Sequence, residues 1–126
     1  MVTEKNDVQS LHFEHRLWSN ELSFFYDEIN IFEHRLEELA NRYGETDLLA
    51  GVEHFQNQFI RQKEVLDQLR HDIGVHEQWI SQLAKANNKI TTADESKHSV
   101  IADSMETFRK IYRDLKQKFY QFMAKQ

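Results

Sequence analysis

Large side chains recur along most of the chain with the alternating three- and four-residue spacing of a heptad repeat. In the first segment they are Leu11, His15, Trp18, Leu22, Phe25, Ile29, Phe32, Leu36, Leu39 and Tyr43. In the second segment they are Leu48, Val52, Phe55, Phe59, Gln62, Leu66, Leu69, Ile73, His76, Ile80 and Leu83. In the third segment they are His98, Ile101, Met105, Phe108, Tyr112, Leu115, Phe119 and Phe122. This spacing predicts helices over about residues 7–43, 47–88 and 93–124.

The connections between the predicted helices are too short to cross the length of a bundle. Successive helices are therefore antiparallel, and we expect an all-α, up-down-up three-helix bundle that forms a single domain over residues 1–126. When the first two helices fold back on each other, Trp18 faces Ile73. The same register puts His15 and His76 in one layer, so the predicted core contains one layer with a histidine from each helix.

The third helix is predicted to dock on one flank of this pair. Val65 and Trp79 occupy g positions of the second helix, and an apolar stripe extends from the g side of the first helix. This stripe consists of Leu17, Phe24 and Ile31. A third helix on the g flank would cover the stripe, whereas a stripe left exposed would be a surface for dimerisation.

The level of the third helix along the bundle follows from its start. Thr92 and Glu95 have the spacing of a capping box, which predicts a helix that begins directly after Thr92. From the connection lengths, His98 is expected level with Leu83, about 10 Å along the axis from the layer of His15. We therefore do not expect His98 to join the other core histidines.

One end of the predicted bundle gathers metal-binding side chains. His12 lies at an e position one turn before His15, and e residues of an antiparallel pair face each other, so Glu77 is expected beside His12. The four residues that would converge are His12, His15, His76 and Glu77. Imidazole nitrogen and carboxylate oxygen suit zinc and other first-row divalent ions. These four residues are the candidate metal ligands, and Glu14, at a g position, is a candidate supporting partner.

The polar residues of the core also have a structural interpretation. His15 and His76 can form a neutral hydrogen-bonded pair that fixes the register of the helices. Gln62, expected opposite Ile29, can specify register in the same way or contact a ligand in a small cavity. The sequence leaves both interpretations open.

Composition excludes several classes of protein. The 126 residues include no proline and no cysteine, which favours uninterrupted helices and excludes disulfide scaffolds and thiolate metal sites. The formal net charge of -5 argues against nucleic-acid binding. Residues 1–10 lack the order of a signal peptide, and no apolar run is long enough for a membrane span. We expect a soluble, cytoplasmic protein without a membrane or nucleic-acid partner.

No motif in the chain predicts catalysis. It contains no phosphate-binding glycine loop, no GxSxG sequence and no HExxH pair. The patterns favour a protein-interaction or self-association module, which binds a protein partner or a second copy of itself. Its expected interaction surface consists of Phe13, Leu17, Phe24 and Ile31. The alternative is a metal-binding protein that uses the His/Glu set and a divalent cofactor such as zinc.

Overall fold

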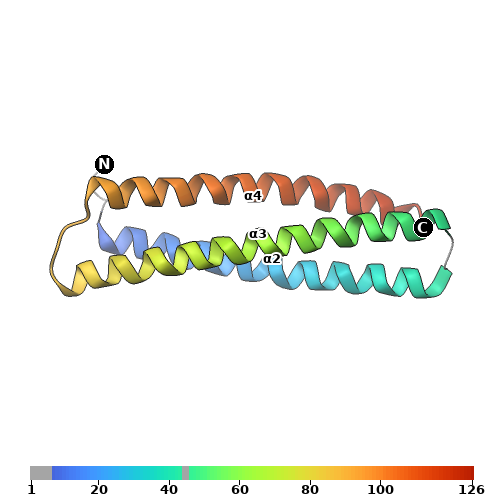
Figure 1. The fold of residues 1–126 in the computed structure, drawn as a ribbon, viewed down its shortest axis with the longest axis horizontal. Coiled ribbons are helices and arrows are strands. Elements are labelled where there is room, and N and C mark those ends of the chain that lie inside the picture. The colour runs from blue at the N-terminus through green and yellow to red at the C-terminus, as the bar shows by residue number, and fades with distance from the viewer. Residues whose placement is uncertain (1–6, 44–45) are drawn as a thin grey trace.

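Three long helices account for most of the computed structural model, which describes residues 7–43 and 46–126. They are α2 (Val8–Tyr43), α3 (Thr46–Lys85) and α4 (Thr92–Ala124). Successive helices run in opposite directions, so α4 is parallel to α2 (Figure 1). The predicted all-α, up-down-up three-helix bundle is confirmed. Each helix boundary lies within one residue of its prediction, except that α3 ends at Lys85 and not at residue 88.

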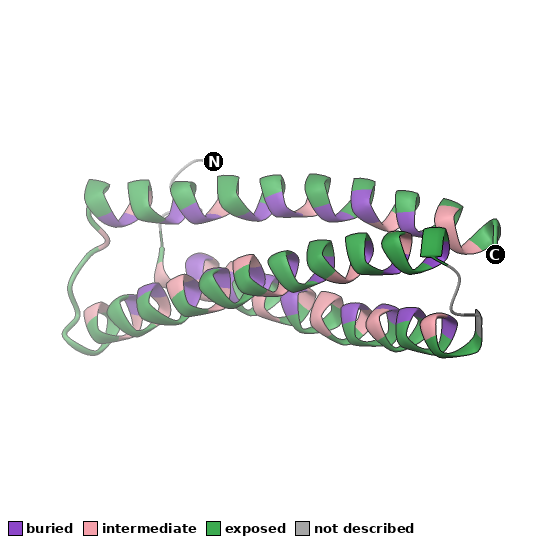
Figure 2. Cartoon of the chain, turned by 45° about the vertical axis from the view of Figure 1, so that its right-hand side comes forward, coloured by how far each residue is buried: buried purple, intermediate pink, exposed green. Residues whose placement is uncertain are grey.

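The predicted heptad positions form a core that runs between the three helices (Figure 2). Phe32 of α2 contacts Phe59 of α3 and Phe119 of α4, with ring centroids 5.6 and 4.8 Å apart. The described heptad residues that are half-buried are Phe25, Leu83 and Phe122. The outward faces are mostly polar but carry exposed apolar side chains on each helix. None of the described helices is apolar over a stretch long enough to cross a membrane.

α3 ends in a Schellman motif at Asn87, whose φ of 58° lies in the left-handed region. The Asn87 N–H donates to the Ala84 carbonyl at 3.1 Å, and the Asn88 N–H donates to the Leu83 carbonyl at 2.9 Å. These bonds satisfy carbonyl groups that have no partner within the helix. Asparagine tolerates left-handed backbone better than most residues do, so the helix ends before the asparagine pair.

α4 begins one residue earlier than predicted because its capping box uses Thr91 and Asp94 in place of Thr92 and Glu95. The Asp94 N–H donates to Thr91 Oγ1 at 3.2 Å, and the Thr91 N–H donates to Asp94 Oδ2 at 3.0 Å. The other carboxylate oxygen of Asp94 accepts a hydrogen bond from the Trp79 indole N–H at 2.6 Å. The first turn of α4 is therefore held beside Trp79.

The position of the first turn of α4 places His98 at a different level along the bundle axis from the predicted one. The connection lengths predict His98 level with Leu83, but its ring centroid lies 5.1 Å from that of His15 and 5.9 Å from that of His76. Because His76 precedes Leu83 by seven residues, the difference is about two helical turns, or about 10 Å. The prediction that His98 stays apart from the other core histidines is wrong, because the contact between Trp79 and the α4 cap sets the level of α4.

α4 docks on the predicted g flank through acidic side chains of α2. Arg109 donates from Nε and Nη2 to the two carboxylate oxygens of Glu21, each at 2.8 Å. Glu28 accepts hydrogen bonds from the Tyr112 hydroxyl at 2.7 Å and from Lys116 at 3.0 Å. Both glutamates occupy g positions, so the contacts confirm the docking flank.

The apolar stripe of α2 stays uncovered. Leu17, Phe24 and Ile31 are 50, 60 and 57% exposed, and Phe13 near the start of the helix is 61% exposed. Of the two alternatives that the sequence left open for the stripe, the structure shows the exposed one. The g-position glutamates bind α4 next to the core, and the stripe lies one helical position further round α2.

Two glycines of α3 provide a matched test of the α3–α4 contact. A Cβ added at Gly51 would collide with the Phe122 ring of α4, whereas one added at Gly74 meets no atom within 4 Å. Gly74→Ala should raise the free energy of unfolding by about 0.5–1 kcal/mol, because alanine favours the helix. Gly51→Ala should raise it less or lower it, because Phe122 must move. Urea unfolding measures both, and equal stabilisation would contradict this packing.

Candidate metal centre

Three buried histidines, one from each helix, meet in the end of the bundle where α2 and α4 begin. His15 of α2, His76 of α3 and His98 of α4 are 2, 3 and 8% exposed. His15 Nε2 lies 3.2 Å from His76 Nδ1 and 3.3 Å from His98 Nδ1. One nitrogen of each ring lies within 4.8 Å of the other two. We refer to these three residues as the histidine layer.

Glu77 holds the His15 ring from the side opposite the layer. Its Oε1 lies 2.7 Å from His15 Nδ1, and its Oε2 lies 2.5 Å from His12 Nδ1 and accepts a hydrogen bond from Ser81 at 3.1 Å. Burial raises the pKa of Glu77, but the hydrogen bonds from His15 and His12 outweigh this effect and hold the pKa below its usual value. Glu77 is therefore an ionised acceptor at neutral pH.

Glu14 and Trp18 hold the His98 ring in a similar way. His98 Nε2 lies 2.8 Å from Glu14 Oε1. The Trp18 ring stacks on the His98 ring, with centroids 4.7 Å apart and planes inclined by 27°. Both partners belong to α2, so that helix orients a histidine that α4 contributes.

These carboxylates determine which ring nitrogens carry protons. An ionised carboxylate accepts hydrogen bonds and cannot donate them, so His15 Nδ1 and His98 Nε2 are protonated. In the neutral rings, His15 Nε2 and His98 Nδ1 are then lone pairs, and they face each other across 3.3 Å. His15 Nε2 can accept one hydrogen bond, from His76, which leaves the His98 lone pair without a donor. A cation between the rings would accept a lone pair from each of the three inner nitrogens, provided that the His76 proton moves from Nδ1 to Nε2.

The environment favours the unprotonated form of His15 and His76. Burial lowers the pKa of His15 and of His76, and the neighbouring imidazoles lower both further. His76 Nε2 is fully buried, with no hydrogen-bond partner among the residues the structure describes. Neutral imidazole is the form that binds metal ions.

Two of the three nitrogen spacings suit a tetrahedral metal centre. Zn–N bonds of about 2.0–2.1 Å place neighbouring ligand nitrogens about 3.3 Å apart in a tetrahedron. Two of the three spacings, 3.2 and 3.3 Å, agree with this value, whereas the nitrogens of His76 and His98 lie within 4.8 Å of each other and would draw closer around an ion. A carboxylate on the outer nitrogen is also the usual means of orienting a metal-binding histidine.

The four ligands predicted from the sequence all lie in this region. Glu77 bonds to His12 and His15, and His76 lies on the other side of His15. The prediction missed His98 as a member of the group. The heptad pattern gave His98 a core position, but its level depends on how α3 ends and α4 begins.

The burial of other polar residues follows their heptad positions. His34, His54 and His71 are exposed. Gln62 is buried, and its Oε1 has no hydrogen-bond partner in the described part of the chain. That Gln62 specifies the register of the helices, or contacts a ligand in a small cavity, stays a prediction in both cases.

Comparisons with known proteins give no relative for this chain. It matches no protein-family model, no curated protein and no solved structure. Its function is therefore inferred from its own residues.

The metal-free protein should lose stability in mild acid. Because the folded-state pKa values of His15 and His76 lie below 6.5, the unfolded state binds more protons as the pH falls through that value. The free energy of unfolding should decrease below pH 6.5, and the lowered pKa of Glu77 should add a further decrease below pH 4.5.

Urea unfolding in the presence of a chelator measures this dependence, and a His34→Gln variant should show the same decrease because His34 is exposed. A free energy that stays constant from about pH 8 to about pH 5 would show that water reaches the layer.

Proposed function

We propose that this protein binds a divalent first-row metal ion, zinc in preference, with His15, His76 and His98 as ligands. The observation that carries the proposal is the convergence of three buried ring nitrogens, one from each helix, within 4.8 Å of one another. Neutral imidazole nitrogens suit zinc, copper and nickel ions. Without an ion, the fixed protons leave the layer one hydrogen-bond donor short, and this shortfall favours a cation there.

Two of the four predicted ligands take a supporting role in this proposal. Glu77 is bonded to His12, His15 and Ser81, so it orients His15 instead of binding the ion. His12 uses Nδ1 to contact Glu77, and its side chain is 44% exposed. Glu14 has the role for His98 that Glu77 has for His15.

Metal binding would also tie the bundle together. Each helix supplies one ligand, so the ion connects α4 to the α2–α3 pair at the end where α4 begins. A ligand that binds the folded chain and not the unfolded chain stabilises the fold by mass action. Metal binding and docking of α4 are therefore coupled.

Zinc should stabilise the untagged protein, and the effect should require His98. At a free zinc concentration about 100 times Kd, the free energy of unfolding should rise by about 2.7 kcal/mol. His98→Ala should abolish this rise, whereas His34→Ala, a change at an exposed histidine, should keep it.

Competition with a chromophoric zinc chelator gives Kd directly, so the comparison holds even if His98→Ala lowers the basal stability. Equal zinc affinity in the two variants would rule out the proposed ligand set.

A second candidate function is self-association through α2. Leu17, Phe24 and Ile31 lie seven residues apart on one face of the helix, and each is at least half exposed. With Phe13 they form the interaction surface predicted from the sequence. An apolar stripe of this length is typical of a surface that packs against another helix.

Two matched substitutions test self-association, one of an isoleucine in the α2 stripe and one of an exposed isoleucine on α3. Ile31→Glu should disrupt self-association, because it places a charge in the stripe. Ile60→Glu changes an isoleucine of similar exposure, 50% against 57%, on α3. Sedimentation equilibrium should show a dimer for the unchanged protein and for Ile60→Glu, and a monomer for Ile31→Glu. If the unchanged protein stays monomeric at high concentration, self-association through α2 is ruled out.

A further inference from the structure

We propose that the bound ion keeps one exchangeable coordination position, which opens to a pocket between α3 and α4 and takes a small anion. This inference rests on the proposed metal function and adds a ligand class to it. A closed site, by contrast, would use a fourth protein ligand and hold the ion for structure alone.

The carboxylates near the histidine layer are all bonded to other groups. Glu77 binds His12 and His15, and Glu14 binds His98. Asp94 accepts hydrogen bonds from the Trp79 indole and from the backbone and hydroxyl of Thr91. These bonds fix either a ligand ring or the start of α4.

Recruiting one of these carboxylates would break such a bond. The histidine layer therefore supplies three ligands, and a tetrahedral ion has a fourth position for water or an added ligand.

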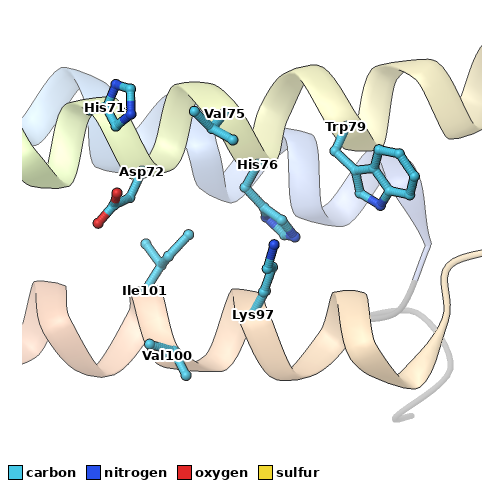
Figure 3. Close-up of a pocket in the computed structure, with 8 residues that line it drawn as sticks. All are labelled: His71, Asp72, Val75, His76, Trp79, Lys97, Val100 and Ile101. Atoms are coloured by element: carbon cyan, nitrogen blue, oxygen red, sulfur yellow. The ribbon is translucent and has the colours of Figure 1, made fainter.

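A pocket of about 510 Å³ reaches the layer at His76. Figure 3 shows His76 of α3 and Lys97 of α4 pointing toward each other across it. The apolar side chains in its wall are Val75, Trp79, Val100 and Ile101. Lys97 is exposed and makes no ion pair among the described residues.

The charges of the pocket favour an anion. Neutral imidazoles bring no negative charge into direct contact with a divalent ion, because the carboxylates of Glu77 and Glu14 lie behind the rings, and Lys97 adds a positive charge at the pocket. Asp72 also lines the pocket, and the hydrogen bond that its Oδ1 accepts from the neutral Gln68 amide at 3.0 Å leaves its negative charge in place, so the charge that attracts an anion is chiefly that of the ion. A small anion, such as a carboxylate or an inorganic pseudohalide, could replace the metal-bound water and lie beside the Lys97 ammonium.

Cobalt-substituted protein separates this inference from the proposal it rests on. Co²⁺ prefers the same ligands as zinc but has visible absorption bands that respond to each ligand. Untagged protein loaded with Co²⁺ should show the intense bands of a tetrahedral ion, and added sodium azide should shift them in a saturable way. Absence of the tetrahedral bands would overturn both the metal site and this inference.

Tetrahedral bands that do not respond to azide would leave the metal site standing and overturn the open position alone. Lys97→Met should weaken azide binding about two- to fivefold, as expected for one exposed charge. Lys110→Met, a change at another exposed lysine of α4 away from the pocket, should leave it unchanged. Azide binding that is equal in the two variants would contradict the assignment of the ligand to the α3–α4 pocket.

Discussion

The site depends on where two protons are held. Glu77 and Glu14 fix protons on the outer nitrogens of His15 and His98, so in the neutral rings both inner nitrogens are lone pairs directed at the same point. His76 can donate one hydrogen bond into this group, but it cannot satisfy both lone pairs. As a hydrogen-bonded layer, these rings leave one nitrogen lone pair without a donor, whereas a cation can bind the lone pairs directly.

This arrangement requires α4 to lie at one particular level. The Trp79–Asp94 hydrogen bond and the Thr91 cap hold the first turn of α4 beside α3, and His98 follows one turn later. Further along the bundle, Glu21 and Arg109 keep α2 and α4 in register. The contacts that define the fold at this end are thus the contacts that complete the histidine layer.

Heptad spacing was sufficient to predict the fold and part of the site. Side chains that recur every three or four residues determine which face of a helix is buried, and the short connections determine helix direction. That information placed His15 opposite His76 and Glu77 next to His12. It could not place His98, because a left-handed Asn87 and a capping box displaced by one residue determine where α4 begins. Both depend on hydrogen bonds that a periodic pattern does not encode. The pattern also left open whether α4 covers the Leu17, Phe24 and Ile31 stripe. Contacts of the g-position glutamates with α4 decide this, and they leave the stripe exposed.

The central claim is that three imidazoles bind one ion. X-ray absorption spectroscopy of the zinc-loaded, untagged protein tests it most directly, because imidazole rings produce characteristic outer-shell scattering. The account predicts a first shell of nitrogen or oxygen atoms at about 2.0–2.1 Å, with outer-shell scattering that fits three imidazoles. A shell that fits oxygen ligands with one imidazole or none would contradict it.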